Sequence, residues 1–358
     1  MSNNLNLFSR YYKTHGMKIF LYPEVMYRWM LNKRDARNRP IFVKSRPNII
    51  QIELTNICNL SCKHCYRHLT KQQLGYMKKD VFEKIISEFK SPVSIGLYGT
   101  GESMLHPEFF DFVEYARKRH RFSTITLTTN GTLLNETSAQ KIIGLRIDKI
   151  CISLDAATPE TYVKTRGKDS FNQILEGIRI LINAREKMHS KTPLVGVNFV
   201  ILEENKKEIL DFVKLTVSLG VDFIGTLRFP LPISPEGAYI DKSKTSLEGI
   251  YNQLVEAKKY IETRKLFIKE SLIQNPETVF NFGDRKGFFC SAPWEYPQIT
   301  WEGEVTPCCV IPFSEVYSLG NIGKSSFGEI WNNPEICAFR RKIKKSIPPI
   351  NWCKKCFY

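Results

Sequence analysis

Six short runs of apolar and β-branched residues alternate with longer helical patterns between residues 49 and 229 of this 358-residue chain. Strands separated by helices favour parallel pairing, because antiparallel neighbours need only a short turn between them. The alternation therefore predicts an α/β fold, a parallel sheet or barrel with helices outside. Functional loops of such barrels follow the carboxyl ends of the strands. The expected strands are Ile49–Leu54, Val93–Tyr98, Phe122–Leu127, Ile147–Leu154, Leu194–Leu202 and Asp222–Arg228.

The chain is long enough for more than one domain. The stiff PLPISP run at Pro230–Pro235 breaks the alternating pattern and marks a domain boundary. The last part is rich in cysteine and tryptophan, and its modest core predicts a metal-stabilised α+β module. The predicted parts are a basic N-terminal extension (1–48), the barrel (49–232), a helical linker (233–286) and the cysteine-rich module (287–358).

The chain contains ten cysteines and no apolar run long enough to cross a bilayer. Its first residues, MSNNLNLFSRYY, show none of the features of a signal peptide, so a cytoplasmic protein is expected. Clustered cysteines in a reducing compartment indicate metal ligands rather than disulfides. Seven of the ten form two groups: Cys58, Cys62 and Cys65, and then Cys290, Cys308, Cys353 and Cys356.

The net charge of +16 is concentrated at the two ends of the chain. Residues 1–48 contain ten basic and two acidic side chains, and residues 338–358 contain seven basic and no acidic ones. Such ends attract an anionic substrate, an acidic electron donor or a lipid surface, and a solvated basic surface is the alternative. No nucleic-acid-binding module accompanies the charge, so no nucleic acid partner is expected. The apolar, aromatic residues 17–31 either form an interfacial helix in peripheral contact with a membrane or cover the lower end of the barrel.

The loop after the first expected strand has the pattern C-x3-C-x2-C, at Cys58, Cys62 and Cys65. Three thiolates on one loop can bind three irons of a [4Fe–4S] cluster and leave the fourth iron without a protein ligand. An open coordination position is what a catalytic metal centre needs. The alternative is a zinc site completed by His64 or His68.

This loop resembles the signature of the radical S-adenosylmethionine (SAM) superfamily. The resemblance implies a partial (β/α)6 TIM-like barrel and two cofactors, a SAM-binding [4Fe–4S] cluster and SAM itself. In that family one electron from the cluster cleaves SAM to methionine and a 5′-deoxyadenosyl radical, which abstracts hydrogen from the substrate. His64 occupies the family's aromatic position, which is expected near the adenine. A flavodoxin or ferredoxin is the expected reductant.

Further motifs of the family follow the strands in order. The GTGE run resembles the motif that receives the methionine ammonium, although Thr100 and Ser103 depart from its common form. TTNG resembles the ribose-side turn, ISLDA ends with groups that can bond the ribose or the carboxylate, and YVKTRG resembles the segment that places an arginine near the SAM carboxylate. The residues expected to bind SAM are His64, Gly99, Gly101, Glu102, Thr129, Asn130, Ser153, Asp155, Arg166 and Asn198.

The second cysteine group has the pattern C-x17-C-x44-C-x2-C. With the phrases GEVTPC, LGNI and EIW, it resembles the auxiliary-cluster domains called SPASM and Twitch. Because the chain ends two residues after the last of these cysteines, it resembles the shorter, one-cluster Twitch form. The resemblance implies a second, auxiliary [4Fe–4S] cluster bound by Cys290, Cys308, Cys353 and Cys356. A structural four-cysteine zinc site fits the same spacing.

Three cysteines lie outside the two groups. Cys151 falls inside an expected core strand and Cys337 on an expected helix, so both are expected to be structural. Cys309 adjoins a predicted cluster ligand. It is either an alternative ligand or, as in the family's epimerases, a hydrogen-atom donor to a substrate radical, and it is the candidate catalytic residue.

The expected activity is hydrogen abstraction from a small polar substrate of the sugar or aminocyclitol type, with an anionic group as one option. Dehydrogenation fits a single auxiliary cluster that accepts an electron, whereas epimerisation needs a hydrogen donor such as Cys309. Two alternatives stay open. One is the same chemistry on a peptide, a protein or a lipid-linked saccharide, and the other is a non-catalytic iron–sulfur electron carrier or redox sensor.

Overall fold

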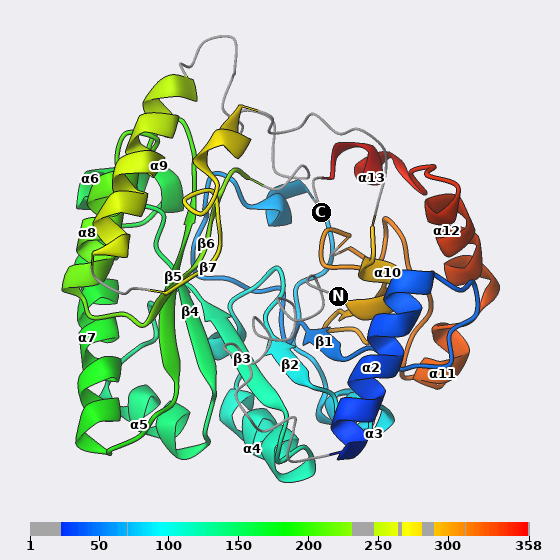
Figure 1. Ribbon diagram of the computed structural model, residues 1–358. Helices are drawn as coiled ribbons and strands as arrows, with labels where there is room; N and C mark the ends of the chain where they lie inside the picture. The colour runs from blue at the N-terminus through cyan, green and yellow to red at the C-terminus, as the bar shows by residue number, and fades with distance from the viewer. Residues whose placement is uncertain are drawn as a thin grey trace.

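A computed structural model shows one nine-stranded sheet with helices packed along it (Figure 1). The structure describes residues 23–69, 71–230, 247–263, 267–280, 290–311 and 313–356. The strand order is β7-β6-β5-β4-β3-β2-β1-β8-β9, and all neighbours are parallel except β8 and β9. The strands are β1 (Ile49–Ile52), β2 (Ser94–Leu97), β3 (Thr124–Thr129), β4 (Lys149–Ser153), β5 (Leu194–Val200), β6 (Phe223–Arg228), β7 (Phe267–Ser271), β8 (Gln298–Ile299) and β9 (Val305–Thr306).

Helices connect successive strands of the parallel part, which confirms the predicted α/β fold. Local sequence fixes their ends. The side chain of Asn135 caps α5 through the backbone amide of Ser138, and Gly167 ends α6 in the left-handed region with φ 76°. The helices are α2 (Pro23–Asn38), α3 (Lys79–Glu88), α4 (Phe109–Arg119), α5 (Glu136–Gly144), α6 (Pro159–Arg166), α7 (Phe171–Lys187), α8 (Ile209–Ser218), α9 (Leu247–Glu262), α10 (Ala292–Glu295), α11 (Phe327–Ile330), α12 (Pro334–Lys344) and α13 (Asn351–Lys355).

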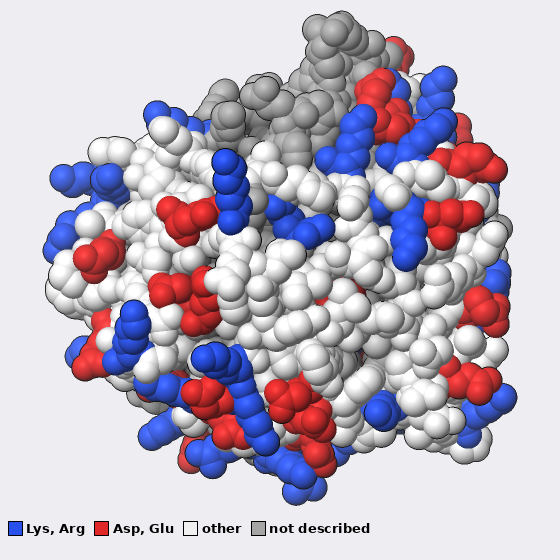
Figure 2. Space-filling view, turned by 180° about the vertical axis from the view of Figure 1, so that it is seen from behind, with Lys and Arg blue, Asp and Glu red and all other residues white. Residues whose placement is uncertain are grey.

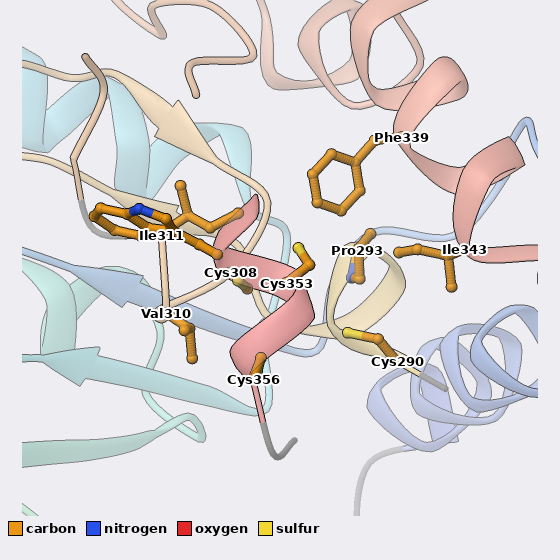
Figure 3. Close-up of a pocket in the computed structure, with 10 residues that line it drawn as sticks. Cys290, Pro293, Cys308, Val310, Ile311, Phe339, Ile343, Cys353 and Cys356 are labelled. Carbon is orange, nitrogen blue, oxygen red and sulfur yellow. The ribbon is translucent and has the colours of Figure 1, made fainter. Parts of the chain in front are cut away.

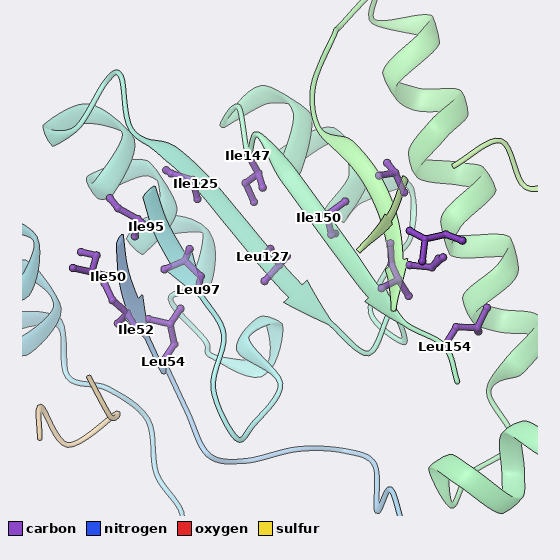
Figure 4. Close-up of a cluster of buried hydrophobic side chains, with 14 of the residues drawn as sticks. Ile50, Ile52, Leu54, Ile95, Leu97, Ile125, Leu127, Ile147, Ile150 and Leu154 are labelled. Carbon is purple, nitrogen blue, oxygen red and sulfur yellow. The ribbon is translucent and has the colours of Figure 1, made fainter. Parts of the chain in front are cut away.

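The hydrophobic core lies between the sheet and its helices (Figure 4). Successive side chains of a strand point to opposite faces of the sheet. On β3, Ile125 and Leu127 are buried in this core, whereas the alternate residues Thr126 and Thr128 are only half-buried. The outer face of the sheet therefore supplies the core, and the inner face is free to carry polar side chains.

The segment expected as a purely helical linker contributes a strand as well as a helix. It contains α9, and it also contains β7, which pairs with β6 and extends the sheet by one strand. Residues 231–246, 264–266 and 281–289 of this region lie outside the described residues.

Helix α2 joins the barrel to the C-terminal module. The Asn32 Nδ2 atom donates a hydrogen bond to the carbonyl oxygen of Trp294 (2.7 Å), and Lys33 forms an ion pair with Glu295. On the other side, Trp29 packs with Val93, just before β2. From Pro23 onwards this helix thus contacts the barrel at the start of β2, and residues 17–22 lie outside the described residues.

Charged side chains of both signs are interspersed over the back of the molecule rather than separated into one basic patch (Figure 2). None of the helices in the described ranges is long and apolar enough to cross a membrane.

Candidate active site

A cavity of about 430 Å³ lies at the carboxyl ends of the parallel strands, where functional loops were expected. This volume is typical of cavities that bind small-molecule ligands. The cavity brings together every residue that the sequence assigned to SAM, the first cysteine group and Cys309. These lining residues are Cys58, Cys62, His64, Cys65, Gly99, Gly101, Glu102, Thr129, Asn130, Ser153, Asp155, Arg166, Asn198 and Cys309.

The three cysteines of the first group lie on the loop after β1, and nitrogen donors approach two of their sulfur atoms. Asn130 Nδ2 lies 3.8 Å from Cys58 Sγ, and Arg166 Nη1 lies 3.4 Å from Cys62 Sγ. Burial raises the pKa of Cys65 to about 11, so this thiol stays protonated unless a metal replaces the proton. Donors aimed at sulfur stabilise the thiolate form, and this donor set fits an iron–sulfur cluster.

A buried carboxylate joins the ends of β2 and β3. Glu102 is 2% exposed, and it accepts hydrogen bonds from Thr129 Oγ1 (2.8 Å) and the backbone amides of Asn130 (2.6 Å) and Met104 (3.2 Å). Burial raises its pKa, and these hydrogen bonds oppose the shift. Glu102 therefore already fixes the turn expected beside the ribose, in addition to lining the cavity.

A second buried carboxylate, Asp155 at the end of β4, holds two of the predicted SAM residues. Its Oδ2 atom lies 2.5 Å from Arg166 Nη2 and 3.5 Å from His64 Nε2, and its Oδ1 atom accepts from the Val200 amide (2.7 Å). Burial lowers the pKa of His64 to about 4, so the imidazole is neutral. Among the described residues, the buried His64 Nδ1 atom has no hydrogen-bond partner. An unpaired polar atom at the cavity wall fits a bound ligand with hydrogen-bonding edges, such as a nucleobase.

The GTGE run approaches its neighbours so closely that side chains would not fit at the glycines. A Cβ at Gly101 would lie 2.3 Å from the carbonyl oxygen of Thr55. A Cβ at Gly99 would lie 2.5 Å from the side chain of Glu53. The run therefore forms a tight cradle beside the first cysteine loop.

Glu53, which no sequence motif predicted, holds this cradle in place. Its fully buried carboxyl group accepts hydrogen bonds from both the backbone N and Oγ1 of Thr100, each at 2.6 Å. Burial raises its pKa to about 7. A signal was present, because an acidic residue directly after the expected strand segment Ile49–Ile52 is costly to bury without a specific partner.

The alternate, inward-facing residues of the strands complete the cavity wall. Cys151, expected to be a buried small hydrophobe, is half-buried and lines the cavity, because its position on β4 faces inward. Asn198 Oδ1 accepts from the Thr226 amide (2.9 Å). Side chains alternate between the two faces of a strand, and this alternation in the sequence could have predicted these inward-facing residues. The lining residues not predicted are Gln51, Leu60, Tyr66, Tyr98, Thr100, Thr128, Cys151, Val200, Gly225, Thr226 and Arg228.

The second cysteine group surrounds a separate, small and almost wholly apolar cavity in the C-terminal module (Figure 3). All four expected ligands line it: Cys290, Cys308, Cys353 and Cys356. Burial raises the pKa of Cys308 and brings that of Cys353 to about 11. Cys308 and Cys309 are adjacent in sequence but line different cavities, so the peptide between them separates the two sites.

Several curated proteins are similar to this chain over most of its length. It is 27% identical over 318 residues to the tungsten-containing aldehyde ferredoxin oxidoreductase cofactor-modifying protein of Pyrococcus furiosus, with 84% of this chain and 85% of that protein covered. It is 28% identical to the antilisterial bacteriocin subtilosin biosynthesis protein AlbA of Bacillus subtilis, over 79% of this chain and 59% of that protein. A probable GTP 3′,8-cyclase of Saccharolobus islandicus is 29% identical, over 62% of this chain and 67% of that protein. These names give no support to the expected sugar-like substrate.

Solved structures show the same fold. Streptococcus suis SuiB matches with a TM-score of 0.66 at 14% identity, covering 87% of this chain and 71% of that one. The enzyme anSMEcpe, solved with AdoMet and the Cp18Cys peptide, matches with a TM-score of 0.61 at 17% identity, covering 87% and 88%.

Two family models match the chain, and between them they span most of it. The model of the radical SAM superfamily matches residues 52–216, and that of the SPASM iron–sulfur cluster-binding domain matches residues 290–357. The chain therefore belongs to the radical SAM superfamily and carries a C-terminal SPASM domain.

Proposed function

We propose that this protein is a radical SAM oxidoreductase that catalyses a dehydrogenation of a peptide substrate: it removes a hydrogen atom, and the resulting substrate radical loses a proton to solvent and an electron to one auxiliary cluster. One observation carries the proposal. A single cavity unites the three-cysteine loop, the residues expected to bind SAM and the adjacent polar wall that includes Cys309. A second, four-cysteine cavity lies behind Cys308.

The residues of the first cavity fit the family's cofactors, a [4Fe–4S] cluster and SAM. When bound, the cluster supplies the electron that cleaves SAM. Cys58, Cys62 and Cys65 would hold the cluster, and the GTGE cradle would hold the methionine part of SAM. The neutral His64 would offer the adenine its Nδ1 atom, which has no hydrogen-bond partner among the described residues. Arg166, fixed by Asp155, places positive charge beside Cys62.

The second cavity fits an auxiliary cluster. Its four cysteines surround a small space, and four thiolates are a complete ligand set for a [4Fe–4S] cluster. With four thiolates and no open position, this site accepts electrons and does not bind substrate, which is the one-cluster Twitch arrangement.

The substrate contacts the part of the wall that the SAM residues do not use. Tyr98, Thr226 and Arg228 lie at the ends of β2 and β6 in the same cavity, and they offer hydroxyl and guanidinium groups. These groups suit the amides and side chains of a peptide. The 28% identical relative named for bacteriocin biosynthesis supports a peptide substrate.

The substrate class is tested by 5′-deoxyadenosine formation under anaerobic conditions, with a flavodoxin or ferredoxin as reductant. Candidate peptides should stimulate SAM cleavage above the rate without substrate. Stimulation by sugars or aminocyclitols, with none by peptides, would overturn the peptide assignment and restore the small polar substrate.

Epimerisation is the second candidate, because the Cys309 thiol lines the same cavity as the SAM residues. Cys309→Ala separates the two reactions. In a dehydrogenase the variant still forms the oxidised product. In an epimerase it consumes SAM without forming product, and the wild-type product gains solvent deuterium in D₂O.

A further inference from the structure

A row of three aromatic rings, each in contact with the next, lies between the two cysteine-lined cavities. The ring centroids of Tyr66 and Phe313 are 5.8 Å apart, with an interplanar angle of 70°. Those of Phe313 and Trp352 are 5.9 Å apart, with an angle of 79°. Both contacts are of the edge-to-face type, in which neighbouring rings touch without a gap.

Each end of this row is attached to a cysteine of a different group. Tyr66 lines the large cavity and directly follows Cys65. Trp352 lines the small cavity and directly precedes Cys353. The order along the row is therefore first cysteine group, Tyr66, Phe313, Trp352 and second cysteine group.

The middle of the row is shielded from water, whereas Tyr66 and Trp352 at its two ends are half-buried. Phe313, its middle member, is 1% exposed. Rings in contact are a better medium for electron tunnelling than aliphatic side chains, because their π electrons are delocalised.

We propose that Tyr66, Phe313 and Trp352 form the path by which an electron passes between the two cluster sites. This inference rests on the proposed function, which places a cluster at each end. One electron leaves the reduced cluster at one site, and the oxidised cluster at the other site gains it. No bond forms or breaks in the rings.

The test follows the reduction of the auxiliary cluster by freeze-quench electron paramagnetic resonance, without SAM or substrate. A photoreduced deazaflavin supplies electrons in less than stoichiometric amount to the reconstituted protein. The Cys58/Cys62/Cys65→Ala variant, which lacks the first cluster, gives the rate of direct reduction. Phe313→Leu and Trp352→Leu each remove a ring. Phe339→Leu is the matched control, because Phe339 is buried and lines the small cavity but its ring contacts Tyr317 instead.

We expect the auxiliary cluster to be reduced faster in the wild type and in Phe339→Leu than in the triple cysteine variant. In Phe313→Leu and Trp352→Leu, the rate of its reduction should fall to that of the triple cysteine variant. Trp352→Phe, which keeps a ring, should retain faster reduction. Wild-type rates in both ring-less variants, or a wild type no faster than the triple variant, would overturn the proposal. The iron content of each variant shows whether it has folded and bound its clusters. If one leucine variant does not fold, the other is sufficient for the test.

SAM cleavage to 5′-deoxyadenosine, measured in the same preparations without substrate, keeps the two proposals apart. It should persist in Phe313→Leu. If the wild type does not cleave SAM, the proposed function fails. If it cleaves SAM while the ring-less variants transfer electrons normally, only the aromatic path fails.

Discussion

The two cysteine-lined cavities differ in nearly every property that decides what a metal site does. The first is large, lined by many polar side chains as well as apolar surface, and offers three cysteines of one loop. The second is small, almost wholly apolar, and offers four. Three ligands leave one iron open to a substrate, whereas four close the cluster. Under the proposed function, iron would therefore serve catalysis in the first cavity and electron storage in the second, and the residues around each site would make the difference.

Removing one cysteine from each cavity should give the largest difference between the two sites. Cys62→Ser should abolish 5′-deoxyadenosine formation, because the first cluster supplies the electron for SAM cleavage. Cys353→Ser should leave SAM cleavage intact and stop formation of the oxidised product. Chromatography of both products after single turnovers measures the contrast. Equal loss of 5′-deoxyadenosine in both variants would remove the distinction between the two sites.

The polar wall of the first cavity predicts a large cost for breaking its buried ion pair. Arg166→Met would leave the Asp155 carboxylate buried without its partner, which costs about 3–5 kcal/mol in free energy of unfolding. The exposed pair of Arg179 and Glu176 is the control, and Arg179→Met should change the value by less than about 1 kcal/mol. Urea unfolding measures both. An equally small loss of unfolding free energy in both variants would show that the burial of the Asp155 carboxylate does not depend on Arg166.

Two glycine-to-alanine substitutions, one in the GTGE cradle and one outside it, should separate an effect on SAM binding from an effect on helix stability. Gly101→Ala places a Cβ 2.3 Å from a carbonyl oxygen, and the required shift should weaken SAM binding by about 1–3 kcal/mol. Gly144→Ala, at the end of α5, meets no atom within 4 Å and should stabilise the helix by about 0.5–1 kcal/mol. Equilibrium dialysis with SAM checks the first value, and unchanged affinity would mean that this loop does not hold SAM.

A smaller effect, on the pH dependence of stability, is expected from Glu53, whose carboxyl group accepts hydrogen bonds from Thr100 of the GTGE run. Its pKa rises from 4.5 to about 7 on folding, so between these values the folded chain binds a proton that the unfolded chain has lost. The free energy of unfolding should therefore fall as pH rises from about 4.5 to about 7 and then level off. Glu53→Gln should remove this slope in urea titrations at several pH values. Identical slopes in the two proteins would contradict the assignment.

Much of this arrangement was predictable from the sequence. Alternating patterns gave the parallel strands, and spacing grouped the cysteines that line each cavity. Because the SAM motifs follow successive parallel strands, they converge at one edge of the sheet. Long-range pairings were not predictable in the same way. The bond of Glu53 to Thr100 joins two loops, and only the packing of β1 beside β2 brings them together.

Two further features needed the three-dimensional structure. The inward orientation of Cys151 depends on strand register, and a shift of one residue would have placed it in the core. Strand β7 was missed because its short run follows a helical pattern and resembled part of the linker. The row of Tyr66, Phe313 and Trp352 joins three distant segments, so no local pattern could reveal it.

The central claim is that the chain holds two clusters of different ligation, and iron and sulfide content after anaerobic reconstitution tests it most directly. The wild type should bind about eight irons and the Cys58/Cys62/Cys65→Ala variant about four. About four irons falling to none, with zinc in the C-terminal cavity, would contradict the claim and remove the electron-acceptor site.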